Sequence, residues 1–280
     1  MNTQMLMSSV TMGQLQKKLD TISHNLANVN TQGYKRREAT FSDLLFQQVN
    51  NQSSDRYEEG RLTPNGIRVG SGAKIGQTAL RIEQGSLQST DRPLDVAITQ
   101  KGHFFQIGVN VDGALETRYT RDGAFYFSPV PGNEALLNLV TQDGDYVLGQ
   151  GGPITIPANH SEIQISNRGT ITARFEDGTT EQVGQLELVN VERPQMLVQM
   201  GQNNFGLPGN LAELGYVAAD ILGVIPNGQV SVEQNMLEMS NVNLQKEMND
   251  LMLAQRSYQF NSRSISMADQ MMGLVNGIRG

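Results

Sequence analysis

The sequence predicts an α+β protein in which N- and C-terminal heptad α-helices, able to form a coiled coil, bracket an antiparallel β-rich domain. Three periodicities predict it: apolar residues recur every three or four positions near the N-terminus, every seven near the C-terminus and every second position between them. The 280 residues are enough for one large or two ordinary domains with a sizeable core.

The first element is a helix that we place at residues 1–33. Asn and Gly in the segment 30–33 favour its end, because both residues terminate helices readily. Ser8 interrupts the heptad pattern of apolar residues between Met5 and Met12. The heptad stripe consists of Met5, Met12, Leu15, Leu19, Ile22, Leu26 and Val29.

The middle of the chain divides into three predicted segments: an extended β/loop arm at 34–89, an antiparallel β domain at 90–205 and a return linker at 206–228. Alternating stretches at 94–98, 105–107, 163–165 and 185–189 read as short strands. Asp-Gly pairs that begin at positions 112, 122, 143 and 177 are typical of hairpin turns.

The last element is a predicted coiled-coil helix at 229–280. No Gly or Pro occurs between Gln229 and Met272, so the helix can run for some forty residues, and helices of that length usually need partners. A second seam, from Asn241 to Asp269, is mostly polar. The apolar residues spaced by seven are Leu237, Leu244, Leu251, Tyr258, Ile265 and Met272.

Composition excludes several functional classes. The formal net charge of −7 argues against a nucleic-acid binder, which needs a basic patch to neutralise phosphates. The absence of cysteine excludes disulfides, thiol nucleophiles and Cys-ligated metals. No apolar run of 18 residues predicts a transmembrane segment, and the N-terminal sequence lacks the features of a cleaved signal peptide.

The residues that carry chemistry form no recognisable catalytic, cofactor-binding or metal-binding motif. His24, His103 and His160 fall in different predicted elements. The glycines of 70–76 do not have the spacing of a phosphate-binding loop, and the basic cluster 35–37 is interpreted as a solvated face. An acid pair for glycoside cleavage stays open, because any two of the 28 acidic residues could form one.

Several sequence blocks resemble the bacterial flagellar rod and hook protein family. The segment 19–34, LDTISHNLANVNTQGY, is similar to the N-terminal signature of that family. The blocks PLDVAI at 93–98, YTRDGAF at 119–125, LEMSNV at 237–242 and AQRSY at 254–258 follow in the family order. The arm at 62–70 and the single β domain most resemble the distal-rod type, while proximal-rod and hook-type proteins remain alternatives.

The resemblance implies a structural subunit of the flagellar basal-body rod that polymerises through its terminal helices into a tube and transmits motor torque to the hook. Its partners would be copies of itself, other rod and hook proteins and the flagellar export apparatus. It would lie outside the cytoplasmic membrane, in the periplasmic or cell-wall region, after export without a cleaved signal. It would need no cofactor and no enzymatic activity.

The resemblance also implies an assembly interface on both helices. The apolar members would pack within and between subunits, and the amides would fix register. The alternatives are an intramolecular helix hairpin for the apolar stripe, and capping or turn formation for Asn28 and Asn30. The interface residues are Leu15, Leu19, Ile22, Asn25, Leu26, Asn28, Val29, Leu237, Asn241, Leu244, Leu251, Tyr258, Ile265 and Met272.

Three further hypotheses complete the interpretation. The Gly-rich stretch 57–76 would lie against a neighbouring subunit and stiffen the rod. A rod-associated cell-wall hydrolase is the enzymatic alternative, which zymography on purified cell wall would test. A β-rich adhesin or ligand binder is the third class, and it would not need helices at both ends of the chain.

Overall fold

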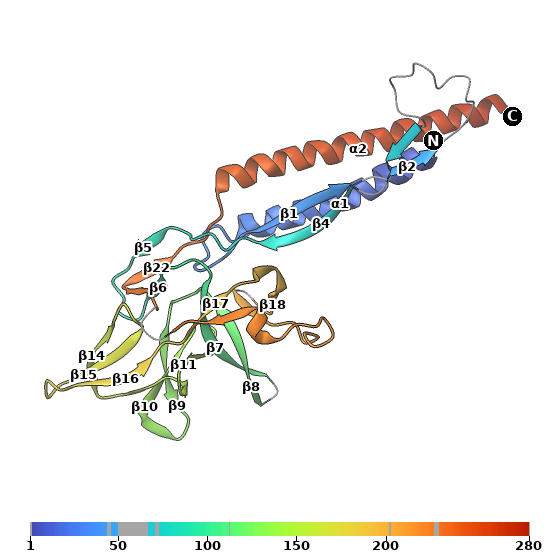
Figure 1. Cartoon of the computed structure of the whole chain (residues 1–280). Helices are drawn as coiled ribbons and strands as arrows, with labels where there is room; N and C mark the ends of the chain where they lie inside the picture. Colours follow the sequence, from blue (N-terminus) through green and yellow to red (C-terminus); the bar gives the residue numbers. More distant parts are fainter. Residues whose placement is uncertain are drawn as a thin grey trace, which may run out of the picture. The chain divides into compact units, whose positions relative to one another are not determined.

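The computed structural model describes residues 2–43, 46–49, 67–70, 73–111, 113–201, 203–226 and 230–279. The chain divides into two units (Figure 1). The helical unit consists of Met1–Leu26, Arg37–Ala79 and Leu244–Gly280, and the β unit consists of Ala27–Arg36 and Leu80–Asn243. The predicted fold class is confirmed, because one helix from each end of the chain brackets a domain of antiparallel strands.

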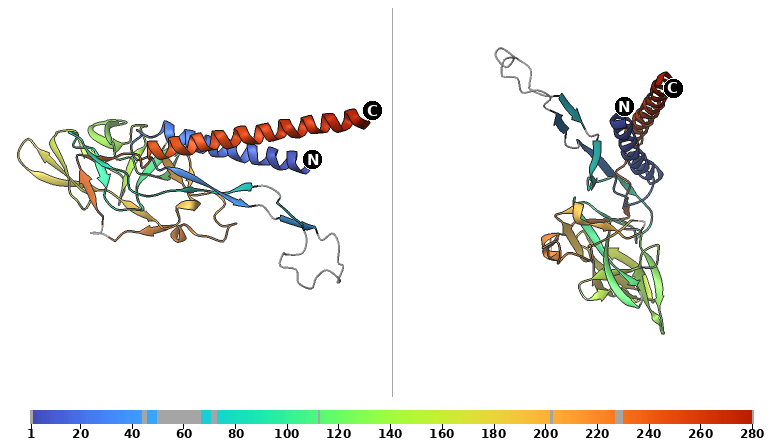
Figure 2. Two further views of the ribbon diagram at one scale, coloured as in Figure 1. Left: turned by 90° about the horizontal axis from the view of Figure 1, so that it is seen from above. Right: turned by 90° about the vertical axis from the view of Figure 1, so that its right-hand side faces the viewer.

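Two helices dominate the helical unit. Helix α1 spans Asn2–Ala27 and helix α2 spans Leu244–Arg279. They run side by side in opposite directions, so that both termini of the chain lie at the same end of the pair (Figure 2). The side chain of Asn25, near the end of α1, donates a hydrogen bond of 3.2 Å to Glu247 in the first turn of α2. This contact fixes the two helices as an antiparallel pair.

Two pairs of strands complete the described part of the helical unit. Strand β1 (Arg37–Asp43) pairs with β4 (Ala73–Leu80), and β2 (Phe46–Val49) pairs with β3 (Ile67–Gly70). The backbone N–H of Ile75 donates to the side chain of Gln14 at 2.9 Å, which places β4 beside α1. Most of the segment 57–76, for which a contact with a neighbouring subunit is predicted, lies outside the described residues.

The largest sheet of the β unit has eleven strands among the described residues, and β7 lies at its centre between β11, β17 and β8. Its main path runs in the order β13-β10-β11-β7-β8-β19-β18. The strands of this sheet are β7 (His103–Val111), β8 (Ala114–Thr120), β9 (Tyr126–Val130), β10 (Asn133–Val140), β11 (Tyr146–Gly149), β12 (Gly152–Pro153), β13 (Thr155–Pro157), β17 (Leu188–Val191), β18 (Val198–Gln199), β19 (Asn204–Gly206) and β20 (Leu222–Val224).

Smaller sheets and two short 3-10 helices complete the β unit. Three strands form the sheet β14-β15-β16, while β6 pairs with β21 and β5 pairs with β22. These elements are β5 (Leu87–Ser89), β6 (Val96–Ile98), β14 (His160–Ile165), β15 (Thr170–Phe175), β16 (Thr180–Gln185), β21 (Val232–Gln234), β22 (Met236–Glu238), η2 (Pro194–Met196) and η3 (Ala218–Asp220).

The core of the β unit follows from the alternation of side chains along its central strand. Phe104 and Phe105 are both fully buried but point to opposite faces of β7, because successive side chains of a strand alternate. Phe105 joins a large cluster that includes Ile163 and Ile171 of the three-stranded sheet. Phe104 joins a second cluster and meets Phe205 edge to face at 5.9 Å between ring centroids.

The structure corrects the predicted start of the C-terminal helix. The helix begins at Leu244 and not at residue 229, because the preceding residues form β21 and β22 and pair with β6 and β5. Asn235, between the two strands, adopts a φ of 60° that breaks any regular structure there. Leu237 and Asn241, which were predicted to be the first heptad positions of the C-terminal helix, therefore lie before the start of α2.

Three smaller expectations were also wrong. Helix α1 ends at Ala27 rather than at residue 33. The predicted return linker 206–228 contributes β20, which pairs with β17. Gly123 does not form the predicted hairpin turn but packs against the backbone of Val96. A Cβ added at Gly123 would lie 1.7 Å from the carbonyl oxygen of Val96.

Candidate assembly surface and the buried junction of the β unit

The buried residues of each helix recur with a period of seven. In α2 the buried residues Glu247, Ala254 and Ala268 lie in one heptad register, and in α1 Ser8, Leu15 and Ile22 do the same. Alanines at the centre of a seam let two helices approach closely. We call the buried seam of α2 at Glu247, Ala254 and Ala268 the inner seam.

Asn25 fixes the register of the helical unit from inside. Its amide group donates to the backbone oxygen of Arg37 at 2.8 Å and to Glu247, and its oxygen accepts the backbone N–H of Arg37 at 3.0 Å. Asn25 is 1% exposed, so a different alignment of the helices would leave its amide buried without these partners. These contacts lie within one chain, and the role predicted for Asn25 in the register of an assembly stays a prediction.

The predicted interface residues have different surroundings. Leu15, Ile22, Asn25 and Leu237 are buried within the chain, and Leu244 is exposed. Asn28 accepts hydrogen bonds from Thr31 at the end of α1, which is the turn-forming alternative. The half-buried members are Leu19, Leu26, Asn28, Val29, Asn241, Leu251, Tyr258, Ile265 and Met272.

A second apolar stripe of α2, which sequence analysis missed, is exposed. It consists of Leu253, Phe260, Met267 and Leu274, which are 58%, 68%, 57% and 68% exposed. We call it the outer stripe. Its members are also spaced by seven, and at 100° per residue they lie roughly 100–120° around the axis from the inner seam. Its period of seven is visible in the sequence, as is that of the register through Leu251.

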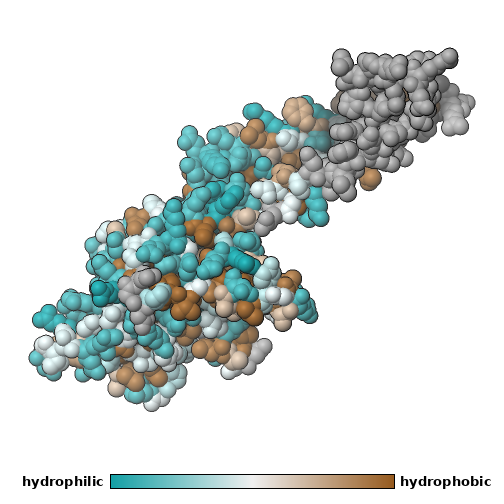
Figure 3. Space-filling model, viewed as in Figure 1, coloured by the Kyte–Doolittle hydropathy of each residue, from teal (hydrophilic) through white to brown (hydrophobic). Residues whose placement is uncertain are grey.

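Exposed apolar side chains are not confined to α2. On the face drawn in Figure 3, hydrophobic residues reach the surface of both units among many hydrophilic ones. In the β unit Val217 and Val224 are 62% and 90% exposed. Val217 precedes η3 and Val224 ends β20, and the two residues do not form a periodic stripe. The outer stripe is distinguished from them by its register along one helix.

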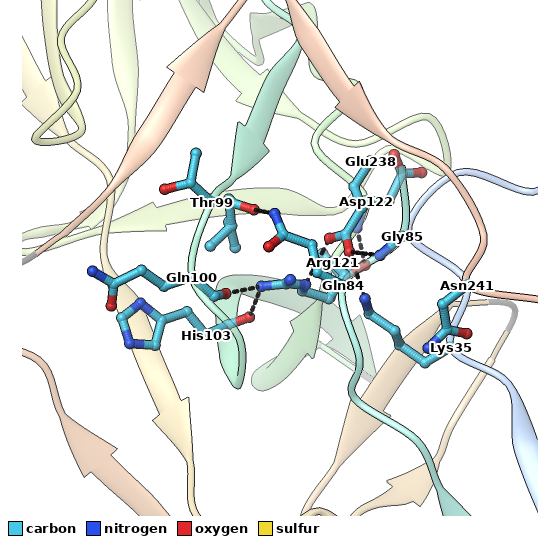
Figure 4. Close-up of polar contacts among 12 residues, drawn as sticks. Lys35, Gln84, Gly85, Thr99, Gln100, His103, Arg121, Asp122, Glu238 and Asn241 are labelled. Carbon is cyan, nitrogen blue, oxygen red and sulfur yellow. Dashed lines mark hydrogen bonds and ion pairs between the residues drawn. The ribbon is translucent and has the colours of Figure 1, made fainter. Parts of the chain in front are cut away.

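A buried charge cluster, which we call the junction, lies within the β unit (Figure 4). The Glu238 carboxylate accepts hydrogen bonds from Lys35 Nζ at 2.6 Å and from the backbone N–H of Gly85 at 2.7 Å. It also forms an ion pair with Arg121 Nε at 2.9 Å. The side chains of these three charged residues are 0–1% exposed. The cluster contains two cations and one anion.

Asn241 extends the junction by hydrogen bonds to two other segments. Its side-chain oxygen accepts the backbone N–H of Arg36 at 2.7 Å. Its amide group donates to the backbone oxygens of Arg81 and Glu83 at 2.8 and 2.9 Å. The segments 33–36, 81–85 and 238–241, distant in sequence, are therefore joined by side chains as well as by backbone bonds.

Burial controls protonation around the junction. Desolvation and the neighbouring Arg121 lower the pKa of Lys35 to about 8. Burial also lowers the pKa of Arg121, against the opposing attraction of Glu238. Desolvation raises the pKa of Asp122 to about 6, although a hydrogen bond from the Ala124 N–H acts in the other direction. The prediction that the basic cluster 35–37 is a solvated face was therefore wrong for Lys35.

The described residues contain no group of three side chains able to hold a metal ion. His24 lies on α1, His103 on β7 and His160 on β14, in separate elements as expected. Neither described helix combines the length and hydrophobicity needed to cross a membrane. The features that remain for a functional interpretation are the outer stripe and the junction.

Comparison with known families matches three parts of the chain. The model for the flagella basal body rod protein matches residues 5–35, which include most of α1. The model for the flagellar hook protein FlgE/F/G D1 domain matches residues 97–173 of the β unit. The model for the flagellar basal body rod FlgEFG protein C-terminal matches residues 233–278, which include β22 and nearly all of α2.

Individual relatives match over nearly the whole chain. The flagellar hook-basal body complex protein FlhP of Bacillus subtilis is 41% identical over 278 residues, which is 98% of each chain. The flagellar basal-body rod protein FlgG of Caulobacter vibrioides is 36% identical over 94% of each chain. FlgG of Bacillus subtilis is 32% identical over 95% of each chain. The chain therefore belongs to the flagellar basal-body rod and hook protein family and is of the distal-rod type.

Proposed function

We propose that this chain is a structural subunit of the flagellar rod that polymerises through its terminal helices and passes motor torque towards the hook. The observation that carries the proposal is similarity to flagellar basal-body rod proteins along 94–95% of the chain, and to a hook-basal body complex protein along 98% of it. The proposed neighbours are further copies of the chain and other rod and hook proteins. Export without a cleaved signal peptide, by the flagellar export apparatus, and a location outside the cytoplasmic membrane belong to the same proposal.

The outer stripe gives this assembly a specific surface. Within one chain the inner seam is buried, whereas the four members of the outer stripe, from Leu253 to Leu274, are exposed. A heptad repeat of apolar residues is the pattern that a coiled-coil partner covers. We therefore assign contact with a second copy to the outer stripe and assign the inner seam to the fold of the single chain.

The predicted interface is refined accordingly. Leu251, Tyr258, Ile265 and Met272 flank the inner seam and are half-buried, so they add area to an assembly without being its centre. Leu244 is 49% exposed and lies at the start of α2. The stiffening role predicted for the segment 57–76 stays a prediction, and deleting this segment should soften or shorten the rod.

The test is replacement of the native rod gene in a flagellated bacterium by the gene for this chain. Isolated basal bodies should contain the protein in the rod, and motility should be restored. A variant with Leu253→Ser, Phe260→Ser and Met267→Ser should be exported but not incorporated. Incorporation of that variant at the wild-type level would contradict the role of the outer stripe, and absence of the wild-type chain from rods would contradict the proposed function.

A further inference from the structure

The junction lies where the β unit is connected to the rest of the chain. The chain enters or leaves this unit at Ala27, Arg36, Leu80 and Asn243. Three of these connections lie at the junction segments. Arg36 ends the segment 33–36, Leu80 directly precedes the segment 81–85, and Asn243 lies two residues after the segment 238–241. Any force that reaches the β unit along the chain enters through these connections.

Backbone hydrogen bonds show how closely the junction segments are joined. The backbone N–H of Gly33 donates to the backbone oxygen of Glu238 at 2.8 Å, and the backbone N–H of Arg81 donates to the backbone oxygen of Arg36 at 3.0 Å. Gly85 packs so tightly that an added Cβ would be 1.9 Å from the oxygen of Met239. The segments therefore have little room to slide past one another.

The charges of the junction are unbalanced. Lys35 and Arg121 are both buried around the single carboxylate of Glu238, and burial lowers the pKa of Lys35. Removing the anion would leave two buried cations without a buried counter-charge, because Glu83, the other carboxylate that acts on Lys35, is exposed. Removing Lys35 would leave one balanced buried pair. A buried charge without a partner costs much more than a missing hydrogen bond. Glu238 is thus the residue on which the junction depends.

We propose that Glu238 is a positioning residue for the transfer of mechanical load. Its carboxylate holds together the three junction segments, next to which the chain enters and leaves the β unit. A force that acts on one of these segments is therefore distributed over all three. This inference rests on the proposed function, since only a torque-bearing subunit carries such load. Without the carboxylate, load would open the junction before it reached the strands of the β unit.

The first test measures the junction itself by native-state hydrogen exchange on full-length protein. Glu238→Gln should speed exchange of the Gly33, Gly85 and Met239 amides at least tenfold. Glu233→Gln is the matched control, because Glu233 is exposed on the neighbouring strand β21, and it should leave exchange unchanged. Equal exchange in the two variants would overturn the proposal.

Two variants separate charge balance from simple packing. Lys35→Met should change exchange at these amides less than threefold, and adding it to Glu238→Gln should recover part of the lost protection. A packing role predicts that Lys35→Met is as harmful as Glu238→Gln and that the double variant is worse than either. That second pattern would overturn the proposal, and the Lys35→Met result decides alone if Glu238→Gln does not fold.

The last test measures load in cells. Rods containing Glu238→Gln should form, but tethered cells should stall at a lower viscous load than cells with Glu233→Gln. If hydrogen exchange at the junction is faster in Glu238→Gln but both variants rotate equally under load, the proposed role of Glu238 in load transfer is overturned. The proposed function would still stand in that case. Absence of the wild-type chain from rods would remove the proposed function and this proposal with it.

Discussion

Substitution of Gly33 by Ala tests the packing of Gly33 against Arg121 and Asp122 within the β unit. Gly33 has a φ of +66°, a conformation that costs a residue with a side chain about 1–2 kcal/mol. An added Cβ would also lie 2.5 Å from the backbone nitrogen of Asp122 and 2.7 Å from the backbone carbon of Arg121. Because these neighbours are backbone atoms, rotation of a side chain cannot relieve the clash.

The magnitude follows from these terms. Movement of the backbone would strain the hydrogen bond of 2.8 Å from the Gly33 N–H to the backbone oxygen of Glu238. Such a hydrogen bond contributes about 1 kcal/mol to stability. Overpacking at such a site adds about 1–3 kcal/mol. The free energy of unfolding should therefore fall by roughly 3 kcal/mol or more in total.

A matched control separates the clash from the backbone conformation. Gly132 has a φ of +84° and no atom within 4 Å of an added Cβ, so Gly132→Ala should cost only about 1–2 kcal/mol. Urea unfolding of both variants, extrapolated linearly to zero denaturant, measures the difference. Equal losses of stability in the two variants would refute the close packing of Gly33 on Asp122.

Two other predictions concern single side chains. Burial raises the pKa of Asp122 to about 6 from an ordinary value of 3.8, so between these values the folded state holds a proton that the unfolded state has lost, and stability falls as pH rises through this range. Asp122→Asn should therefore raise the free energy of unfolding at pH 7.5, by up to about 3 kcal/mol, with little effect near pH 4; urea titrations at both pH values check this, and a uniform effect would contradict it. Ala254 is 3% exposed in the inner seam, so Ala254→Leu should cost about 1–3 kcal/mol by overpacking, whereas Leu253→Ala at an exposed position should cost less than about 0.5 kcal/mol. Thermal unfolding followed by circular dichroism of the helices compares them, and equal melting temperatures would contradict the division into inner seam and outer stripe.

The fold class could be predicted because periodicity is a local property of the sequence. The heptads of residues 5–29 and 244–272 and the alternation in strands such as β7 are visible without any long-range information. The start of α2 could not be predicted in this way. Residues 232–238 contain no helix breaker and form strands only because β5 and β6, more than 130 residues earlier in the chain, pair with them.

The candidate site was only partly predictable for a similar reason. Lys35 lies in a basic run that looks solvated, and its burial depends on Glu238, which is 203 residues away. The outer stripe was present in the sequence as a second apolar heptad. The periodicity of apolar residues does not predict that a third register, that of Glu247, Ala254 and Ala268, is the one buried within the chain.

Sedimentation velocity of the full-length protein at increasing concentration tests the central claim most directly. Wild-type protein should self-associate, while the variant with Leu253→Ser, Phe260→Ser and Met267→Ser should stay monomeric with the same helix content. Covering one such side chain contributes about 1.5–3 kcal/mol, so even Phe260→Ser alone should weaken association at least tenfold. Identical association of the wild-type and triple-variant proteins would contradict assembly through the outer stripe.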